Sequence, residues 1–430
     1  MPPGKGVPME IKAIRGVKDI LPGEVEKWQF VEGVAREVFE RYGYAEIKIP
    51  IFEHTGLFAR SIGETTDIVE KEMYSFEDQG GETLTLRPEA TAGICRAYVE
   101  HKLHQQPGFV KFYCIGPMFR YERPQAGRFR QFYQIDVEAI GEASPVVDAE
   151  VLTMLMTFLQ RLGLQQLELH LNSLGDAVCR PRYREELKSY IRGHLDRLCP
   201  ECQGRFERNP LRVLDCKKEG CQAVMRDAPQ TMAFLCEPCR QHFETLADLL
   251  AGVGLSYVLD PKLVRGLDYY TRTTFEVVAA GLGAQNSVTG GGRYDGLIEE
   301  IGGPPTPGIG FAIGFERLVT VLEHHGLTIP EPRPQVFVAP LGASALHEAF
   351  VLVERLRGAG LRAEIGYDER SLRSQLRRAN RLGAAFTVML GERELAIGKV
   401  SLKDMQGGEQ AEIPLAEVIA YLQERAQKSV

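Results

Sequence analysis

The spacing of apolar residues predicts two long amphipathic helices in the first part of the chain. Between residues 24 and 41 apolar side chains recur three and four positions apart, and Gly43 follows as a helix stop. A second helix is expected over residues 145–162. It starts after Ser144, whose hydroxyl can cap it, and ends at Gly163.

Stretches in which apolar and polar residues alternate accompany these helices. They cover residues 44–52, 83–86, 110–115, 130–140 and 165–171. Loops or hairpin-like turns connect them more often than helical crossovers do. An antiparallel sheet is therefore favoured over a doubly wound parallel one, and the fold class expected is α+β, an antiparallel sheet flanked by helices.

The pattern also divides the chain into parts. Residues 176–252 are helical, polar and rich in cysteine, and they separate two strand-rich stretches, so we interpret them as a helical insertion. The main domain then consists of residues 10–175 and 253–327, after a loose tail of residues 1–9. The proline-rich residues 328–334 form a linker, and residues 335–430 alternate between strands and helices as a compact α/β module does.

Composition limits the class of protein. The 430 residues are 44% apolar and 25% charged, which is typical of a globular chain, and no apolar run is long enough to span a membrane. The first ten residues lack the apolar core of a secretory signal, so a cytoplasmic location is expected. The net charge is −7, yet residues 332–430 carry 14 Lys and Arg against 12 Asp and Glu. A polyanionic partner would therefore bind through local basic patches, because the net charge of the whole chain does not attract it.

The first candidate site is a basic hairpin with interleaved aromatic residues. Residues 119–134 contain four arginines, and Pro124 and Gly127 force a turn between two alternating stretches. Residues two apart on a strand share a face, so Arg128 and Arg130 could act together. Arginine forks grip phosphate oxygens, and an aromatic ring can stack on a purine. A solvated basic hairpin fits this stretch, taken alone, equally well.

Two further stretches combine glycine with charged and aromatic residues. Residues 308–317 read Gly-Ile-Gly-Phe-Ala-Ile-Gly-Phe-Glu-Arg, and the third glycine is one residue late for a dinucleotide fingerprint. We expect these glycines to let a strand and a helix pack closely, with Arg317 pointing at a phosphate. Residues 263–276 and Gly-Gly-Gly-Arg-Tyr-Asp-Gly at 290–296 suggest a wall of a pocket for a small polar ligand. A loop followed by a core strand is the plainer alternative.

Taken together, these stretches resemble the class II aminoacyl-tRNA synthetases. Residues 120–134 are similar to motif 2, residues 308–317 to motif 3, and Arg-Pro-Glu-Ala-Thr at 87–91 to the amino-acid loop. Residues 263–275 and 290–296 resemble the two signatures of the histidyl-tRNA synthetase family. The resemblance covers about residues 10–430 and implies that the main domain is catalytic, that residues 335–430 bind the anticodon, and that the chain is a homodimer with residues 28–52 at its interface.

The resemblance implies an enzyme that uses ATP and Mg²⁺ to join L-histidine to tRNA(His) through a histidyl-adenylate. Arg120, Arg265 and Arg317 would be catalytic, because fixed positive charge stabilises a phosphoryl group during transfer. The ATP-binding residues that the resemblance implies are Arg120, Glu122, Arg128, Phe132 and Arg317. No general base is needed, because the attacking carboxylate is ionised near neutral pH.

The resemblance also implies residues for histidine and for tRNA. The histidine-binding set is Glu89, Thr91 and Gln134 for the ammonium group and Glu138, Tyr269, Tyr270 and Tyr294 around the imidazole. A salt-bridged strand residue is the alternative for Glu138. Arg123 and Gln125, at the tip of the motif 2 turn, would meet the tRNA acceptor end. In residues 371–382 an apolar face of Leu372, Leu376 and Ala379 leaves Arg373, Arg377, Arg378 and Arg381 for phosphates or simply for solvent.

Six of the nine cysteines lie between Cys199 and Cys239. In a chain with no secretory signal, clustered cysteines suggest a metal before disulfides. Cys199-Pro-Glu-Cys202 and Cys236-Glu-Pro-Cys239 predict one tetrahedral structural zinc, with two thiolates from each pair. The alternative is reduced cysteines packed as small apolar residues, which is what we expect of Cys95, Cys114 and Cys179.

A second hypothesis for the whole chain is a regulatory paralogue that binds histidine and has no ligase activity. Such paralogues typically lack the anticodon-binding domain and much of the arginine set. Arg120, Arg265, Arg317 and a C-terminal module are all present here, so the ligase is favoured.

Overall fold

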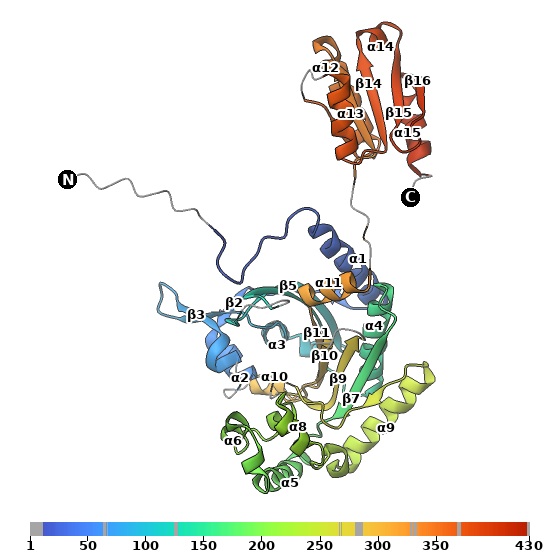
Figure 1. The fold of residues 1–430 in the computed structure, drawn as a ribbon. Coiled ribbons are helices and arrows are strands. Elements are labelled where there is room, and N and C mark those ends of the chain that lie inside the picture. The colour runs from blue at the N-terminus through green and yellow to red at the C-terminus, as the bar shows by residue number, and fades with distance from the viewer. Residues whose placement is uncertain are drawn as a thin grey trace, which may run out of the picture. The chain divides into compact units, whose positions relative to one another are not determined.

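The computed structural model describes residues 12–62, 66, 68–123, 128–265, 267, 269–279, 287–326, 329, 333–367 and 371–427. The chain divides into two compact units, residues 1–329 and 330–430 (Figure 1). Among the described residues, no helix is both long enough and apolar enough to cross a membrane.

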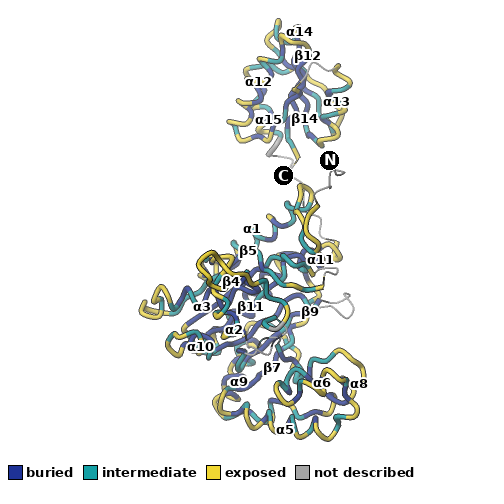
Figure 2. Tube along the Cα trace, turned by 90° about the vertical axis from the view of Figure 1, so that its left-hand side faces the viewer, coloured by how far each residue is buried: buried dark blue, intermediate teal, exposed yellow. Residues whose placement is uncertain are grey.

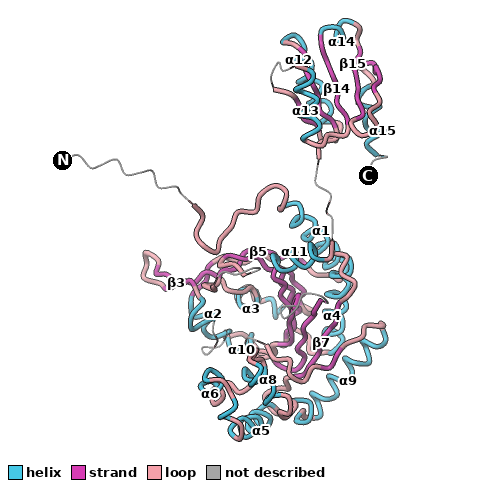
Figure 3. The backbone as a smooth tube through the Cα atoms, in the orientation of Figure 1, coloured by secondary structure: helices cyan, strands magenta, loops and turns pink. Residues whose placement is uncertain are grey.

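A large sheet forms the centre of the first unit (Figures 1 and 3). The described residues give it eight strands, in the order β1 (Ala45–Glu46), β5 (Val110–Phe119), β6 (Gln131–Ile140), β11 (Gly308–Gly314), β10 (Ser287–Arg293), β9 (Thr271–Ala279), β7 (Leu167–Ser173) and β8 (Val258–Leu259). All pairs from β5 to β7 are antiparallel, and the short edge strands β1 and β8 pair in parallel. The predicted antiparallel sheet is confirmed.

Alternation along β6 separates a core face from a cleft face. Ile135, Val137 and Ala139 point into the largest hydrophobic core of the unit, and the residues between them point the other way. Residues 134–140 are nonetheless all buried, so the polar residues in this part of the strand are buried too. This combination places polar chemistry in the middle of the sheet.

One face of the sheet is covered by helices that share the largest core. They are α1 (Val25–Arg41), α4 (Pro145–Arg161), α9 (Glu237–Gly252) and α11 (Phe315–His324). Trp28 of α1 stacks on Phe315 of α11 with 4.2 Å between the ring centroids. As predicted, Ser144 caps α4, and its Oγ accepts the N–H of Val146 at 3.2 Å.

The opposite face carries shorter elements and the cleft. These elements are α2 (Thr55–Ile62), the π-helical turn η1 (Ile68–Glu72), α3 (Thr91–Glu100), η2 (Leu103–Gln105), α10 (Leu297–Glu300) and a small sheet of β2 (Phe52–His54), β4 (Thr83–Leu86) and β3 (Tyr74–Glu77). Their apolar side chains, such as Ile94 of α3 and Leu297 of α10, form a second core against the sheet.

The single strand predicted over residues 44–52 is wrong, because the chain forms β1 and β2 in two different sheets. Between them, the carbonyl oxygens of Ile49 and Pro50 accept hydrogen bonds from Nη1 of Arg87, at 2.8 and 3.3 Å. Pro50 has no N–H to donate to a sheet, and the buried arginine supplies the partners that a neighbouring strand would have offered.

The insertion consists of helices packed around their own small core. They are α5 (Arg180–Arg192), η3 (Leu195–Arg197), α6 (Pro200–Arg205), α7 (Leu211–Leu214), α8 (Glu219–Met225) and η4 (Thr231–Phe234), and α9 leads back to the sheet. Figure 2 shows the outer turns of this part as exposed, whereas the strands of the sheet are mostly buried.

The second unit is a five-stranded mixed sheet, as far as its described residues show. Its order is β13 (Ala363–Ile365), β12 (Val336–Leu341), β14 (Phe386–Gly391), β15 (Lys399–Asp404) and β16 (Gln410–Pro414). The helices are α12 (Ala343–Gly358), α13 (Leu372–Arg381), α14 (Glu392–Ala396) and α15 (Val418–Gln427). Side chains of α12 and α15 pack on one face of the sheet, and Ala379 of α13 packs on the other. The predicted α/β module is confirmed.

Candidate functional site

A polar cleft lies on the face of the sheet opposite to α1 and α4. It consists of two adjoining cavities of about 380 and 370 Å³ that share Arg120, Arg128, Gln134, Arg265, Gly290 and Ala312. The first cavity is also lined by Glu89, Thr91, Glu138, Tyr269, Tyr270 and Tyr294, and the second by Glu122, Phe132 and Arg317. The structure thus brings together every described residue that the sequence predicted for histidine, for ATP and for catalysis.

Glu138 is the centre of the first cavity. The hydroxyl of Thr91 donates to its Oε1 at 2.6 Å, and the hydroxyl of Tyr294 donates to its Oε2 at 2.5 Å. The described residues therefore give the carboxyl two hydroxyl partners and no ion pair, so the salt-bridged alternative for Glu138 does not hold. Tyr294 packs edge to face on Tyr269, whose ring lies 4.7 Å from that of Tyr270. The result is a small pocket with aromatic walls and one carboxyl group.

Glu89 is held by the first turn of α3. Its two carboxylate oxygens accept the backbone N–H groups of Thr91 and Ala92, at 2.9 and 2.8 Å. These N–H groups have no partner inside the helix, so a carboxylate satisfies them and also meets the positive end of the helix dipole. The bonds fix Glu89 beside Thr91 and orient both residues toward Glu138.

Glycines make room for this pocket. A Cβ atom on Gly308 of β11 would lie 2.3 Å from the ring of Tyr294, and one on Gly292 of β10 would lie 3.0 Å from the ring of Tyr270. The packing of a strand on a helix, which the sequence suggested for these glycines, therefore does not explain Gly308. Gly308 frees space on the strand itself for a side chain of the pocket, whereas a Cβ on Gly314 would have only Cβ of Arg317 on α11 as a neighbour, at 3.8 Å.

Burial raises the pKa values of the carboxyl groups in the cleft. It raises the pKa of Glu138 to about 8, against the lowering effect of the hydrogen bonds from Thr91 and Tyr294. It also raises the pKa of Glu89, and it raises that of Asp136 well above the ordinary range. Burial thus opposes the ionisation of these carboxyl groups, and a cationic ligand in the cleft would favour it.

Arginines dominate the second cavity. Nε of Arg120 donates to the carbonyl oxygen of Pro88 at 2.8 Å, and its guanidinium lies 5.2 Å from the ring centroid of Phe132. Burial, and then the positive charge of Arg128, lower the pKa of Arg317. Such mutual repulsion between cations shows a surplus of positive charge, which suits a polyphosphate.

Arg265 lies across the strand β10. A Cβ atom on Gly290 would fall 2.3 Å from its Nη1, so the glycine lets the guanidinium lie flat between the two cavities. The carboxylate of Glu276, 3.8 Å from Nη1 of Arg265, orients it from the other side. This position borders both cavities.

The expected cooperation of Arg128 with Arg130 is wrong. Arg128 lines both cavities and its Nη1 donates to Glu122 at 3.3 Å. Arg130 instead lies over the ring of Tyr121, 4.0 Å from its centroid. The regular strand begins only at Gln131, so the alternation of side-chain directions does not extend back to both arginines.

The sequence analysis missed two residues near the cleft, Asp136 and Arg212. Asp136 lies between Gln134 and Glu138 on the cleft face of β6, and its charge and that of Arg87 influence each other. Neither of its carboxylate oxygens has a hydrogen-bond partner in the described part of the chain. The alternation of β6 could have signalled Asp136. Arg212, on α7 of the insertion, also lines the first cavity, and no local pattern indicated that it would.

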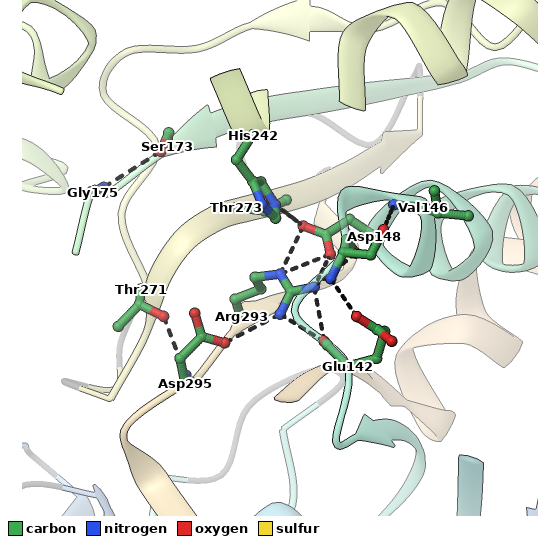
Figure 4. A network of polar contacts seen from close by, with 11 residues as sticks. Glu142, Val146, Asp148, Ser173, Gly175, His242, Thr271, Thr273, Arg293 and Asp295 are labelled. Carbon is green, nitrogen blue, oxygen red and sulfur yellow. Dashed lines mark hydrogen bonds and ion pairs between the residues drawn. The ribbon is translucent and has the colours of Figure 1, made fainter. Parts of the chain in front are cut away.

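A buried ionic network lies beneath the cleft (Figure 4). Nε and Nη2 of Arg293 contact Oδ1 of Asp148 at 2.8 and 2.7 Å, and both side chains are fully buried. Oδ2 of Asp148 also accepts the hydroxyl of Thr273 at 2.6 Å and contacts Nε2 of His242 at 2.8 Å. These residues come from β10, α4, β9 and α9, so the network ties the returning helix of the insertion to the sheet.

The structure describes only one of the two residues predicted for the tRNA acceptor end, and that residue, Arg123, lines neither cavity. Arg123 is exposed, and Gln125 falls outside the described residues. On α13, Leu372 is exposed and Gln375 is buried in its place, because Gly366 leaves room for the amide. The guanidinium of Arg378 lies 5.2 Å from the ring centroid of Tyr367, at the side of the sheet.

The cysteines form two clusters, so the prediction of one site with two thiolates from each pair is corrected. Cys199 and Cys202 lie with Cys216 and Cys221, whereas Cys236 and Cys239 lie with Asp176 and Cys179. The two pairs sit at the starts of α6 and α9, which pack into different parts of the insertion. Cys95 and Cys114 are buried thiols, as expected, while Cys179 belongs to the second cluster.

Comparison with known proteins agrees with this geometry. The pattern of the family described as histidyl-tRNA synthetase matches residues 16–318, and that of the anticodon binding domain matches residues 335–425. A histidine–tRNA ligase of Desulforamulus reducens is 55% identical over 412 residues, which are 96% of this chain and 98% of that protein. One of Pelotomaculum thermopropionicum is 53% identical over 412 residues, 96% of this chain and 97% of that protein.

A solved structure supports the same assignment. The crystal structure of apo S. aureus histidyl-tRNA synthetase has 39% sequence identity and a TM-score of 0.82, and the match covers 96% of this chain and 99% of that one. Family pattern, relatives and fold agree along nearly the whole length. The chain therefore belongs to the histidyl-tRNA synthetase family of the class II aminoacyl-tRNA synthetases.

Proposed function

We propose that this chain ligates L-histidine to tRNA(His) in two steps, with a histidyl-adenylate between them. The observation that carries the proposal is the junction of two unlike cavities at Arg265. One is a carboxyl and tyrosine pocket, and the other is rich in arginine. A carboxylate held in the first would meet an α-phosphate held in the second.

Histidine would enter the first cavity with its ammonium group toward Glu89, Thr91 and Gln134. Its imidazole would then face Glu138 and Tyr270. Because the pKa of Glu138 is raised to about 8, its carboxyl group can donate a proton to the ligand or accept one from it near neutral pH. A pocket built to bond both imidazole nitrogens rejects analogues that leave its groups unpaired, by about 10⁴-fold in favourable cases.

ATP would occupy the second cavity. Its adenine would stack on Phe132, with Arg120 at the α-phosphate and Arg128 and Arg317 toward the γ-phosphate. The histidine carboxylate then attacks the α-phosphorus and pyrophosphate leaves. Arg265, which lies between the cavities, would stabilise the charge that develops on the α-phosphate. No residue has to act as a general base, because the nucleophile is already ionised.

Mg²⁺ fits the donors of this cavity. The ion prefers oxygen ligands and commonly combines one or two carboxylates with phosphate oxygens and water. The carboxylate of Glu122, which lines the cavity beside Arg128, would hold it there. Bound Mg²⁺ neutralises phosphate charge and so favours the loss of pyrophosphate.

In the second step a terminal ribose hydroxyl of the tRNA would attack the adenylate carbonyl and release AMP. Arg123 is exposed next to the motif 2 turn and would guide the acceptor end, together with Gln125. Residues 335–430 would bind the anticodon. The metal that the cysteines of the insertion could hold would be structural, because no cysteine lines either cavity in the described part of the chain.

The enzyme is proposed to act in the cytoplasm as a homodimer. An apolar surface at the small sheet supports the dimer: Phe52 and Phe76 of this sheet, and Tyr121, which packs against Tyr74 of β3, are each about half exposed. Phe52 and Phe76 lie on one face of the sheet, since both pair with alternate residues of β4. A second copy of the chain would cover this face, next to the segment of residues 28–52 that the sequence predicted for the interface.

The histidine-binding regulatory paralogue stays the second candidate. It needs only the first cavity, whereas the ligase needs both. The arginines of the second cavity have no role in a protein that merely senses histidine, and they therefore favour the ligase.

Histidine-dependent exchange of pyrophosphate into ATP tests the proposal. The wild-type chain should catalyse exchange with histidine and with no other amino acid. Arg265→Ala should lose about 10²-fold or more in kcat, by analogy with the loss of one transition-state donor. Arg192→Ala serves as the matched control, since it removes only an exposed ion pair with Glu207 in the insertion. Absence of exchange in folded wild-type protein with Mg²⁺ would favour the regulatory paralogue instead.

A further inference from the structure

The insertion holds two separate sets of four side chains, each of which is arranged for one metal ion. In each set one ligand atom from every residue lies within 4.8 Å of the other three. The first set is Cys199, Cys202, Cys216 and Cys221, and the second is Asp176, Cys179, Cys236 and Cys239. Reduced cysteines packed only as small apolar groups have no reason to converge four at a time.

The distances within each set fit tetrahedral zinc. Thiolates about 2.3 Å from such an ion lie about 3.8 Å apart, and a carboxylate oxygen about 2.0 Å from it lies about 3.5 Å from the thiolates. Sγ of Cys199 is 4.0 Å from Sγ of Cys216, and Sγ of Cys179 is 3.9 Å from Sγ of Cys239. In the second set, Oδ1 of Asp176 lies 3.5 Å from Sγ of Cys179 and 3.7 Å from Sγ of Cys236.

Backbone groups are already directed at the sulfur atoms. The N–H of Cys199 donates to Sγ of Cys221 at 3.2 Å, and the N–H of Asp176 donates to Sγ of Cys179 at 3.3 Å. Such bonds stabilise negative charge on sulfur, which a metal-bound thiolate carries. At the second set, Nη2 of Arg272 also lies 3.6 Å from Oδ2 of Asp176 and can balance part of the charge.

We propose that the chain binds two structural zinc ions, one in each set, and that they close different parts of the insertion. The first ion joins the start of α6 to the segment from α7 to α8, and so closes the outer part. The second joins the entry into the insertion, at Asp176 and Cys179, to the start of α9, where the chain returns to the sheet. It therefore clamps the two ends of the insertion together.

Two contacts connect the second zinc site to the proposed histidine pocket. Cys179 directly precedes α5, and Arg180 at the start of α5 donates to the carbonyl oxygen of Tyr270. Arg272, which contacts Asp176, is the second residue of β9, the strand that follows Tyr270. Loss of this ion should therefore loosen one wall of the pocket, and loss of histidine affinity should accompany loss of the metal.

Metal content decides the proposal. The full-length wild-type chain, purified without chelator, should contain two zinc ions per chain by elemental analysis. Cys202→Ser with Cys221→Ser should contain one, and so should Cys236→Ser with Cys239→Ser. Cys95→Ser with Cys114→Ser is the matched control, because these buried cysteines belong to neither set, and it should retain two.

Substitution of Co²⁺ for zinc tests the proposed ligands in the wild-type chain, so this test does not depend on whether a variant folds. Replacement of zinc by Co²⁺ in the wild-type chain should give tetrahedral d–d bands, with sulfur-to-cobalt charge transfer from seven thiolates in all. Removal of the metal by a chelator should lower the thermal midpoint, and added zinc should restore it. A folded wild-type chain with no zinc, with one zinc, or with iron in its place would overturn the proposal.

Discussion

A Cβ atom on Gly310 would lie 1.9 Å from Oε2 of Glu138. The two residues face each other across neighbouring strands, since Gly310 pairs with Glu138 in the register of β11 and β6. The carboxyl group of Glu138 thus occupies the space that a side chain at position 310 would need. Gly310 and Glu138, the carboxylic acid of the proposed histidine pocket, are in this way two parts of one feature.

Gly310→Ala should strongly weaken histidine binding in the activation step while the chain stays folded enough to purify. The methyl group would displace Glu138 and would also lie 2.3 Å from the carbonyl oxygen of Val137, so neither neighbour can yield without cost. We expect the KM for histidine in pyrophosphate exchange to rise by about 10²-fold or more. Gly296→Ala is the control, because nothing lies within 4 Å of its new Cβ and Gly296 lines neither cavity. Equal activity of the two variants would refute the role given to Gly310.

Gly290→Ala should act on the rate rather than on histidine binding. Its Cβ would lie 2.3 to 2.5 Å from the guanidinium of Arg265, which is the movable end of a long side chain. The arginine would shift from its place between the cavities, and kcat for exchange should fall roughly 10-fold to 100-fold. Gly296→Ala, where nothing lies within 4 Å of the new Cβ, should leave kcat unchanged. A rise in the histidine KM alone would contradict this account.

The stability of the unliganded chain should fall as the pH rises toward and through 8, in part because of Glu138. Burial raises the pKa of this carboxyl to about 8, so the folded chain keeps it neutral where the unfolded chain ionises it. A pKa that is raised by folding contributes stability below the ordinary range of the carboxyl and loses it as the pH passes the folded value. The thermal midpoint should therefore decline less from pH 6 to pH 9 in Glu138→Gln than in the wild type. Parallel curves for the two proteins would exclude the effect.

Breaking the pair of Asp148 and Arg293 should destabilise the first unit strongly. Burial alone would raise the pKa of Asp148, but hydrogen bonds and charges from His242 and Arg293 lower it, so the carboxylate is ionised in the fold. Arg293→Met or Asp148→Asn removes the fully buried partner of the remaining charge, at a cost of about 3–5 kcal/mol in urea unfolding.

Two comparisons make this measurement specific. The double change Asp148→Leu with Arg293→Met removes both charges and should cost less than the sum of the two single changes. Arg192→Ala breaks an exposed pair with Glu207 and should cost less than about 1 kcal/mol. Additive costs at Asp148 and Arg293 would mean that the two residues do not stabilise each other.

Arg123→Ala should separate the two steps of the reaction. The side chain is exposed and lies in neither cavity, so exchange of pyrophosphate should stay at the wild-type level. Transfer of histidine to tRNA should lose about 10-fold in kcat/KM, which corresponds to one lost phosphate contact, and its dependence on salt should weaken. Arg60→Ala, an exposed change on α2, offers a comparison, and loss of exchange in Arg123→Ala would contradict the assignment.

Local sequence patterns predicted the elements whose cause is local. The helix α1 and the capped start of α4 follow from the spacing of apolar residues and from one hydroxyl before a proline. Most residues of the cleft were predicted as well, from the family resemblance, because the stretches that resemble motif 2, motif 3 and the two histidine signatures are each contiguous in the sequence. The residues of each such stretch can be identified from the sequence without knowing which parts of the fold pack against it.

The tertiary structure alone decided which distant groups meet. It assigned Cys199 and Cys236 to different clusters, bent the chain at Pro50 toward Arg87, and brought Arg212 of the insertion to the cleft. It also showed that Gly310 serves Glu138. Spacing along the chain determines only which face of an element a side chain takes. Which faces then come together depends on how helices and strands far apart in sequence pack, and that packing is a property of the whole core.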